Sequence, residues 1–309
     1  MKESNKNNKI TFYVVADPHL TYPVKSTERL SEDSINILKT TISDINLRGA
    51  DFVFFLGDLI ESREFGLVNL RIAYEIMNEL TMSWFVIMGN HDLRYRSTLD
   101  GYQKSSFINK FNDHGPYGST AYWSYDDPGS NLTFVGLDSP VEGYSYGEIE
   151  EEQKEWLEDT LYAIDADRRV ILLSHHPLIL FDDEIKNIEG MDVYLLKNHN
   201  EIRRIIEKTN KVVLTLSGHN HTCRYLHLNG VDYIGCPSIN IWPTMYTKFI
   251  IDDYEFLFNY IKIKDFEKTV KSKNRIFNND SPIVECFGSS EAAYRYYKKG
   301  QKGGRIKFT

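Results

Sequence analysis

Metal-binding residue types follow five apolar runs of this chain. The runs occupy residues 13–16, 52–56, 84–88, 170–173 and 212–216, and their continuous hydrophobicity is typical of strands buried on both faces. Open α/β sheets place their sites beyond the carboxyl ends of the strands, so we expect the residues after these runs to converge. These residues are Asp17 and His19; Asp58; Asn90, His91 and Asp92; His175 and His176; and His219 and His221. They supply enough ligands for two metal ions.

The spacing within these blocks favours shared ligation. Asp17 and His19 stand two positions apart at the end of a strand, where such side chains point the same way. His219 and His221 have the same spacing. Asp58 follows a glycine, which allows a sharp turn of the backbone. Two ions roughly 3.5–4 Å apart need a bridging group, and we expect the Asp58 carboxylate to be that bridge.

The blocks also form an ordered string of motifs. The string reads Asp17-Pro18-His19, Gly57-Asp58, Gly89-Asn90-His91-Asp92, Ser174-His175-His176 and Gly218-His219-Asn220-His221. In this order it resembles the motif string of the calcineurin-like metallophosphoesterase superfamily, and most closely that of the bacterial cyclic-nucleotide phosphodiesterase-like group. One block alone would be weak evidence, whereas five blocks in order over residues 17–221 are a specific match.

The resemblance implies a role for each residue of the string. His91 would be a general acid or a clamp on the phosphate, and Asp92 would hydrogen-bond its other ring nitrogen and fix the tautomer. The cofactors would be two divalent metal ions, with Mn and Fe expected first and Zn as an alternative. The roles of His176 and of His114, which lies outside the motifs, stay open. One ion would be held by Asp17, His19, Asp58 and His221, and the other by Asp58, Asn90, His175 and His219.

The implied function is hydrolysis of a phosphoester, and we expect a phosphodiester of a small, cyclic-nucleotide-like substrate. Metal-activated hydroxide would attack phosphorus, and His91 would protonate the leaving group, a step worth roughly 10²–10⁴-fold. Glu61 and Asp92 depart from the protein phosphatase pattern, and Glu61 stands where purple acid phosphatases have a metal-bound tyrosine. Alternatives are a nucleotide-sugar or CDP-alcohol-type pyrophosphatase, a phosphomonoesterase and, in another class, a catalytically silent protein-interaction scaffold.

Strands and helices alternate along the chain, which indicates an α/β fold. Amphipathic helices are predicted over residues 27–47, 67–80, 147–164 and 200–208. Hairpins are predicted for residues 121–125 with 132–137, 224–228 with 231–235, and 248–251 with 255–264. These β-rich additions suggest a second sheet. The resemblance implies two mixed β-sheets packed as a sandwich flanked by helices.

Composition limits the remaining possibilities. The 309 residues carry a net charge of −8, so general affinity for nucleic acid is not expected, and a small phosphodiester or nucleotide is the expected partner. Three cysteines and an N-terminus without an apolar segment favour the cytoplasm, and no run is long enough to span a membrane. We expect residues 1–264 to form the catalytic domain and 265–309 a basic extension packed on it. The sequence leaves the oligomeric state open.

Overall fold

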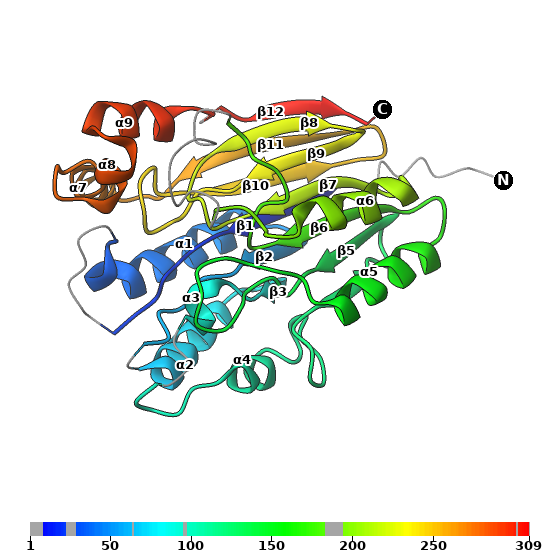
Figure 1. Ribbon diagram of the computed structural model, residues 1–309, viewed down its shortest axis with the longest axis horizontal. Coiled ribbons are helices and arrows are strands. Elements are labelled where there is room, and N and C mark those ends of the chain that lie inside the picture. Colours follow the sequence, from blue (N-terminus) through cyan, green and yellow to red (C-terminus); the bar gives the residue numbers. More distant parts are fainter. Residues whose placement is uncertain are drawn as a thin grey trace.

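Two six-stranded sheets form the centre of the molecule. The computed structural model describes residues 9–22, 29–63, 65–94, 98–182, 194–300 and 302–308. The sheets lie face to face, and helices cover their outer surfaces (Figure 1). The predicted fold class, two mixed sheets in a sandwich between helices, is therefore confirmed.

The first sheet combines early and late segments of the chain. Its strands are β1 (Ile10–Val15), β2 (Phe52–Leu56), β3 (Ser83–Ile87), β10 (Met245–Ile251), β11 (Glu255–Lys262) and β12 (Gly304–Lys307). Their order across the sheet is β12-β11-β10-β1-β2-β3. Strands β1, β2 and β3 are parallel, whereas β10, β11 and β12 join through antiparallel pairs.

The second sheet uses the middle of the chain. Its strands are β4 (Trp123–Asp126), β5 (Leu132–Gly136), β6 (Arg169–Ser174), β7 (Val212–Ser217), β8 (Arg224–Leu228) and β9 (Val231–Gly235). They lie in the order β4-β5-β6-β7-β9-β8. Strands β5, β6, β7 and β9 are parallel, and the edge strands β4 and β8 pair antiparallel as the predicted hairpins require. Asn229 and Gly230 both have positive φ, which is the turn that an Asn-Gly pair favours.

Aromatic side chains fill the space between the sheets. Phe54 from the first sheet lies 4.5 Å from Phe134 of the second, measured between ring centroids, and Phe12 lies 5.8 Å from Phe134. All three side chains are fully buried. Burying such rings supplies about 1.5–3 kcal/mol each, so this layer fixes how the two sheets face one another.

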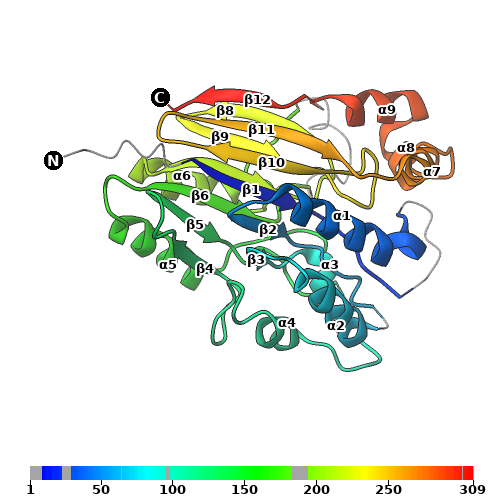
Figure 2. The same cartoon turned by 180° about the vertical axis from the view of Figure 1, so that it is seen from behind.

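Helices of the first half of the chain cover the outer face of the first sheet (Figure 2). They are α1 (Ser34–Arg48), α2 (Gly66–Met77), α3 (Asn90–Leu93) and α4 (Lys104–Lys110), and the 3-10 helix η1 (Ser31–Asp33) leads into α1. The helix predicted over 27–47 thus begins at Ser34. Its first predicted residues, 27 and 28, lie outside the described residues, and Arg29 and Leu30 precede η1 as irregular backbone.

Two helices cover the outer face of the second sheet. They are α5 (Glu151–Ala163) and α6 (His199–Thr209), close to the predicted ranges. Leu157, Leu161, Ile202 and Ile206 point into the core that they share with β5, β6 and β7. Among the helices that the structure describes, none combines the length and apolarity needed to cross a bilayer.

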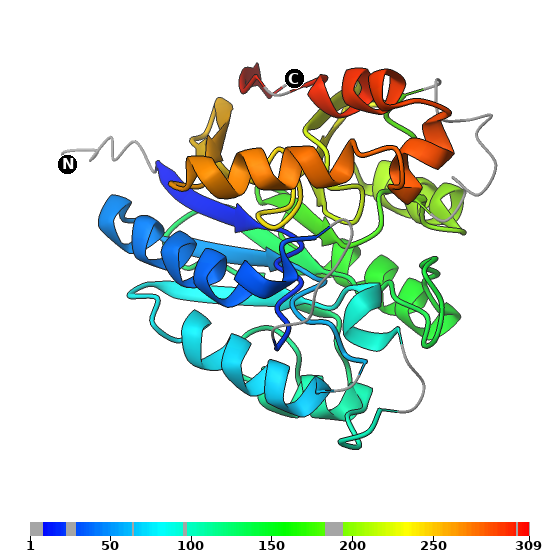
Figure 3. The same ribbon diagram turned by 90° about the vertical axis from the view of Figure 1, so that its left-hand side faces the viewer.

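Three short helices, α7 (Phe266–Ile276), α8 (Pro282–Phe287) and α9 (Ser290–Lys298), follow β11. Each begins at a side-chain cap, because the side chains of Asp265, Ser281 and Ser289 accept hydrogen bonds from the first turns. In Figure 3, α7 lies beside α1 at the end of the molecule that carries the loops after the strands. The helices pack on Trp242 and on one another.

Candidate metal centre

The loops after the parallel strands have an unusual backbone. Non-glycine residues with positive φ cost about 1–3 kcal/mol each and persist where the surrounding structure imposes them, often at functional sites. Most of the predicted metal ligands adopt this conformation, with φ between 43° and 64°. They are Asp17, His19, Asp58, His219 and His221. Five strained residues in one place indicate that the loops are shaped for their side chains.

Two glycines let the loops after β2 and β3 touch. A Cβ atom on Gly57 would lie 2.6 Å from the backbone nitrogen of Gly89, and a Cβ on Gly89 would lie 2.1 Å from that of Asp58. Neither distance is possible for real atoms, and Gly57 also has a φ of +82°. The glycines of the GD and GNHD blocks therefore bring Asp58 next to Asn90.

The structure brings the first predicted ligand set together. Asp17, His19, Asp58 and His221 each offer one oxygen or nitrogen atom, and these atoms lie within 4.8 Å of one another. They come from the loops after β1, β2 and β7, which belong to both sheets. The backbone nitrogen of His219 donates to Asp17 Oδ1 at 3.0 Å and so ties the two sheets together at this point.

The carboxylate of Asp58 lies between two groups of histidines. Its Oδ2 is 3.7 Å from Nε2 of His19, and its Oδ1 is 3.4 Å from Nε2 of His175. The backbone N–H of His91 also donates to Oδ1 at 2.6 Å. One oxygen faces each group, as a bridge between two cations requires.

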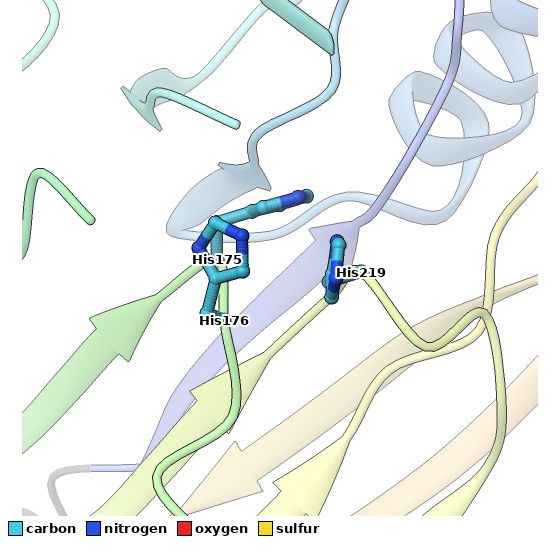
Figure 4. Close-up of side chains that lie close together, drawn as sticks. All are labelled: His175, His176 and His219. Carbon is cyan, nitrogen blue, oxygen red and sulfur yellow. The ribbon is translucent and has the colours of Figure 1, made fainter. Parts of the chain in front are cut away.

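The second predicted set lies on the other side of Asp58. Asn90 Oδ1 is 3.0 Å from His175 Nε2, and the ring centroids of His175 and His219 are 5.0 Å apart. Figure 4 shows His175 and His176 after β6 beside His219 after β7. Asn90, His175 and His219 are all buried. This set is therefore assembled next to the first.

His176 lies beside the second set, but its ring nitrogens already have protein partners. Each of the three histidines His175, His176 and His219 offers one ring nitrogen, and these nitrogens lie within 4.8 Å of one another. However, Nδ1 of His176 contacts Ser139 Oγ at 2.8 Å, and Nε2 contacts the carbonyl oxygen of Ser145 at 3.1 Å. Because both ring nitrogens already have protein partners, His176 acts as a structural residue in this arrangement. His114, by contrast, stacks on Trp84 with ring centroids 3.4 Å apart.

The donor atoms fit cations. His175 Nδ1 lies 2.7 Å from the carbonyl oxygen of Leu56, which only accepts, so Nδ1 carries the hydrogen. A neutral ring then directs the lone pair of Nε2 at the oxygens of Asn90 and Asp58, so positive charge must lie between them. Burial opposes protonation, but the Asp58 carboxylate raises the pKa of His175 to about 9. A proton or a metal ion satisfies this arrangement.

His19 is held in the form that binds metals. Its Nδ1 lies 3.0 Å from Glu61 Oε1, and its Nε2 lies 3.2 Å from Nε2 of His221. Burial, reinforced by the charge of Arg29, lowers the pKa of His19 to about 3. A neutral His19 that donates from Nδ1 to Glu61 leaves the lone pair of Nε2 directed at the rest of the set.

Glu61, and not Asp92, holds the other nitrogen of His91. The Nδ1 of His91 lies 2.9 Å from Glu61 Oε2. Asp92 instead accepts hydrogen bonds from the backbone nitrogens of Ile60 at 3.0 Å and Gly89 at 2.8 Å. The predicted hydrogen bond between Asp92 and His91 is therefore wrong. The reason is that Asp92 points toward the start of α3 and the loop after β2, where two buried N–H groups need an acceptor.

Asp92 and Glu61 have opposite electrostatic environments. Burial, with the nearby charge of Asp58, raises the pKa of Asp92 to about 8. Burial also acts on Glu61, but His91 and Arg29 outweigh it and hold the pKa of that carboxyl well below its usual range. Glu61 is thus an anion beside two histidines.

Two arginines contact the remaining nitrogen of His91. Arg29 and Arg94 approach its Nε2 to 3.0 Å and 3.1 Å. A guanidinium only donates, so Nε2 accepts here, and the proton of the ring lies on Nδ1 toward Glu61. Arg29 also forms an ion pair with Glu61 Oε1 at 3.0 Å.

A pocket of about 200 Å³ opens over these residues. Its polar wall contains both arginines and members of both ligand sets, and its apolar wall comes from later segments of the chain. The polar residues include Arg29, Asp58, Asn90, His91, Arg94, His219 and His221. The apolar residues are Ile241, Ile276 and Ile283, and Tyr194 and Tyr297 add aromatic rings.

The comparisons with known proteins agree with this geometry. The model of the calcineurin-like phosphoesterase family matches residues 10–223, more than half of the chain. The chain belongs to the calcineurin-like phosphoesterase family. It is therefore an enzyme that hydrolyses phosphoesters, and the fold of this family implies a dinuclear site for divalent metal ions, which the two donor sets fit.

Curated relatives of this phosphoesterase come from bacteria. It is 28% identical to a probable glycerophosphodiester phosphodiesterase GpdQ of Arcobacter nitrofigilis, over 67% of this chain and 70% of the relative. It is 26% identical to a probable cyclic nucleotide phosphodiesterase of Moraxella catarrhalis, over 76% and 81%. Among solved structures, a dimetal phosphatase from Danio rerio has the same fold, with a TM-score of 0.66, 16% identity, and coverage of 83% and 97%.

Three residues of the phosphoesterase site escaped prediction: Glu61, Arg29 and Arg94. Glu61 follows Asp58 by three positions, and this short distance from the GD block could have indicated a partner for His91. Arg94 follows the GNHD block by two positions, and its nearness to that block could likewise have indicated a residue of the site. Arg29 lies in irregular backbone before η1, and nothing in its local sequence indicates that it reaches the site.

Proposed function

We propose that this phosphoesterase is a phosphodiesterase that acts on a small nucleotide, and that His91 protonates the leaving group. The observation that carries the proposal is the environment of His91. Its Nδ1 is held by an anionic carboxylate, and its Nε2 contacts two arginines that line the same pocket as Asp58 and Asn90. A ring held in this way is suited to deliver a proton to an oxygen that leaves phosphorus.

The metal ligands in this proposal are the two sets that flank Asp58. Two divalent ions, when bound, supply positive charge against the phosphate oxygens and lower the pKa of water toward neutrality. Nitrogen and oxygen donors without thiolate suit Mn and Fe, with Zn as the alternative. The first set is Asp17, His19, Asp58 and His221, and the second is Asp58, Asn90, His175 and His219.

The two arginines can exchange His91 for the substrate phosphate as their hydrogen-bond acceptor. In the structure, Arg29 and Arg94 donate to Nε2 of His91. A phosphate is a stronger acceptor for a guanidinium than a neutral imidazole, because the bond is then charge-assisted on both sides. Bound substrate therefore draws the arginines onto its oxygens. Nε2 is then free to take up a proton from water, and the resulting imidazolium, held at Nδ1 by Glu61, gives that proton to the leaving oxygen.

The pocket favours a small substrate. At about 200 Å³ it lies below the roughly 300–1,000 Å³ of sites that enclose a whole ligand. It accommodates the reacting phosphate and part of one substituent, and this is unlike the flat surface that a phosphoprotein needs. The names of the relatives, a glycerophosphodiester and a cyclic nucleotide phosphodiesterase, support a diester over a monoester. Pyrophosphatase activity on nucleotide-sugar or CDP-alcohol substrates is the runner-up.

The cytoplasm is the compartment that we propose. All three cysteines have free thiols, and Cys223 and Cys236 are buried. Free buried thiols are typical of proteins that fold in a reducing compartment.

A matched pair of chromogenic substrates tests the proposal. The protein is stripped of metal, reloaded with Mn, and assayed with bis-p-nitrophenyl phosphate and p-nitrophenyl phosphate, which share one leaving group. We expect kcat/KM for the diester to exceed that for the monoester at least tenfold. Preference for the monoester would replace the proposal with a phosphomonoesterase, and inactivity on both despite bound metal would favour the silent scaffold.

A further inference from the structure

The apolar wall of the pocket comes largely from a segment that the family model does not match. The match ends at residue 223, whereas Ile276, Ile283 and Tyr297 belong to α7, α8 and α9. We call residues 265–309 the C-terminal extension. It contributes one apolar residue from each of its three helices to a pocket whose polar wall belongs to the matched region.

The extension is fastened on the side of the second sheet. The guanidinium of Arg224, buried near the start of β8, donates to the carbonyl oxygens of Tyr296 at 2.8 Å and Lys299 at 3.1 Å. It is itself oriented by Asp182 at 2.6 Å. Hydrogen bonds from a charged donor are stronger than those between neutral groups, so the end of α9 has a fixed position.

The extension is also fastened beside the catalytic pocket. Arg275 of α7 donates to the carbonyl oxygen of Arg29 at 2.6 Å and forms an ion pair with Glu32. Lys271, one turn earlier, pairs with Glu32 at 2.8 Å and Asp33 at 2.6 Å. The extension thus holds the backbone of Arg29, the residue whose side chain contacts both Glu61 and His91.

The surface that the extension presents to the pocket is suited to an apolar group. Ile276 and Tyr297 are buried in the cluster around Trp242, and Ile283 is partly exposed on the same side. The opposite wall carries the arginines and both ligand sets. A ligand with an anionic end and an apolar end matches these two walls, as a nucleotide with its base does, whereas glycerol has no apolar surface to offer the second.

We propose that the C-terminal extension is the specificity element of this enzyme, and that Ile283 contacts the nucleobase of a nucleotide diester. The inference rests on the proposed phosphodiesterase function and names the part of the chain that selects the substituent. A nucleobase can make this apolar contact and glycerol cannot, so the contact separates a nucleotide from a glycerol diester.

The test compares two natural diesters in the Mn-loaded full-length protein. The substrates are 3′,5′-cyclic AMP, which carries a base, and glycerophosphoethanolamine, which does not. We expect Ile283→Ala to lower kcat/KM for cyclic AMP about tenfold, through KM, because a few methylenes in an apolar pocket discriminate by that amount. The value for glycerophosphoethanolamine should stay within twofold. Ile283→Val should produce a smaller change in the same direction, which keeps the test valid if the alanine variant folds poorly.

Ile205→Ala on α6 is the matched control, since Ile205 is also partly buried but packs in the core under the second sheet. This variant should change kcat/KM for neither substrate. Equal losses on both substrates in the Ile283 variants would make the extension merely structural and overturn the inference. Turnover of glycerophosphoethanolamine without turnover of cyclic AMP would also overturn it, while leaving the phosphodiesterase function intact. Wild-type inactivity on both, and on bis-p-nitrophenyl phosphate, would contradict the proposed function itself.

Discussion

Glu61 and His91 form a hydrogen-bonded pair in which Oε2 lies 2.9 Å from Nδ1, and the other oxygen of the same carboxylate lies 3.0 Å from Nδ1 of His19. One carboxylate therefore orients a candidate metal ligand and the candidate general acid at once. The candidate metal centre and the candidate proton donor thus share the Glu61 carboxylate as a hydrogen-bond partner. Any change to Glu61 should disturb both.

We expect Glu61→Gln to reduce kcat by roughly 10–100-fold, because outer partners of metal-binding histidines typically contribute that much to affinity or activity. The amide keeps the size of the carboxylate but removes its charge and one acceptor oxygen. Steady-state kinetics and metal content per chain measure the two effects. Glu75→Gln, an exposed glutamate on α2 paired with Arg71, is the control and should match wild type. Normal kcat in Glu61→Gln would show that the pair does not matter for turnover.

Asp92 should behave as a structural residue of the turn. Asp92→Ala leaves the backbone N–H groups of Ile60 and Gly89 buried without an acceptor, at a cost of about 1–3 kcal/mol each. We expect Asp92→Asn, which keeps one acceptor oxygen, to cost clearly less. Urea unfolding of both variants measures the difference. If Asp92→Ala unfolds at the same urea concentration as wild type yet is inactive, the residue acts in catalysis and not in the turn.

The sequence sufficed to predict which side chains lie together at the site, because their positions depend on local features. Each predicted ligand lies in a loop after a strand, and parallel strands bring such loops to one edge, so the sequence predicts that Asp17, Asp58 and His219 meet. The division into two ligand sets came from the family resemblance and stays a prediction. The side-chain direction of Asp92 could not be predicted in this way. It depends on which buried N–H groups lack an acceptor once α3 has formed, and that is decided by the packing of the GD loop against it.

The parts that escaped prediction depend on contacts between distant segments. Arg29 is placed by Arg275, which lies 246 positions later in the chain. The apolar wall of the pocket needs α7, α8 and α9 to fold back over the loops, and the basic composition of this segment gave no indication of that role. Long-range ion pairs of this kind leave no periodic signal in the sequence.

The contact between the extension and η1 should be sensitive to acid. Hydrogen bonds from Arg275, outweighing burial, lower the pKa of Glu32 from 4.5 to about 2. A carboxyl whose pKa is lowered by folding stabilises the folded state at pH values above its pKa in the unfolded chain. It loses that contribution as the pH falls toward 2. We expect wild type to exceed Glu32→Gln in unfolding free energy at pH 6 by on the order of 1 kcal/mol, after allowance for solvent screening. The two should converge near pH 2.

Unfolding in urea at pH 6, 4 and 2.5 measures this difference. Glu79→Gln, which changes an exposed carboxyl after α2, should show no such dependence on pH. A difference between wild type and Glu32→Gln that stays constant over this range would show that ionisation of Glu32 does not stabilise the contact.

His91→Ala should retain both metal ions and lose most of its turnover. General acid catalysis contributes roughly 10²–10⁴-fold, and the loss should be largest for poor leaving groups. We therefore expect a much larger decrease for cyclic AMP, which expels an alkoxide, than for bis-p-nitrophenyl phosphate, which expels a stable phenolate. Equal decreases would contradict the role as proton donor, and loss of bound metal would make His91 a ligand.

In the proposed mechanism, a dinuclear metal centre bridged by Asp58 hydrolyses a phosphodiester. The most direct measurement adds Mn stepwise to metal-stripped wild type and to Asp58→Asn, recording bound metal per chain and hydrolysis of bis-p-nitrophenyl phosphate together. We expect wild-type activity to reach its plateau near two ions per chain, and Asp58→Asn to bind at least one ion fewer and to stay nearly inactive. Diester hydrolysis by the stripped protein, or two tightly bound ions in Asp58→Asn, would contradict the account.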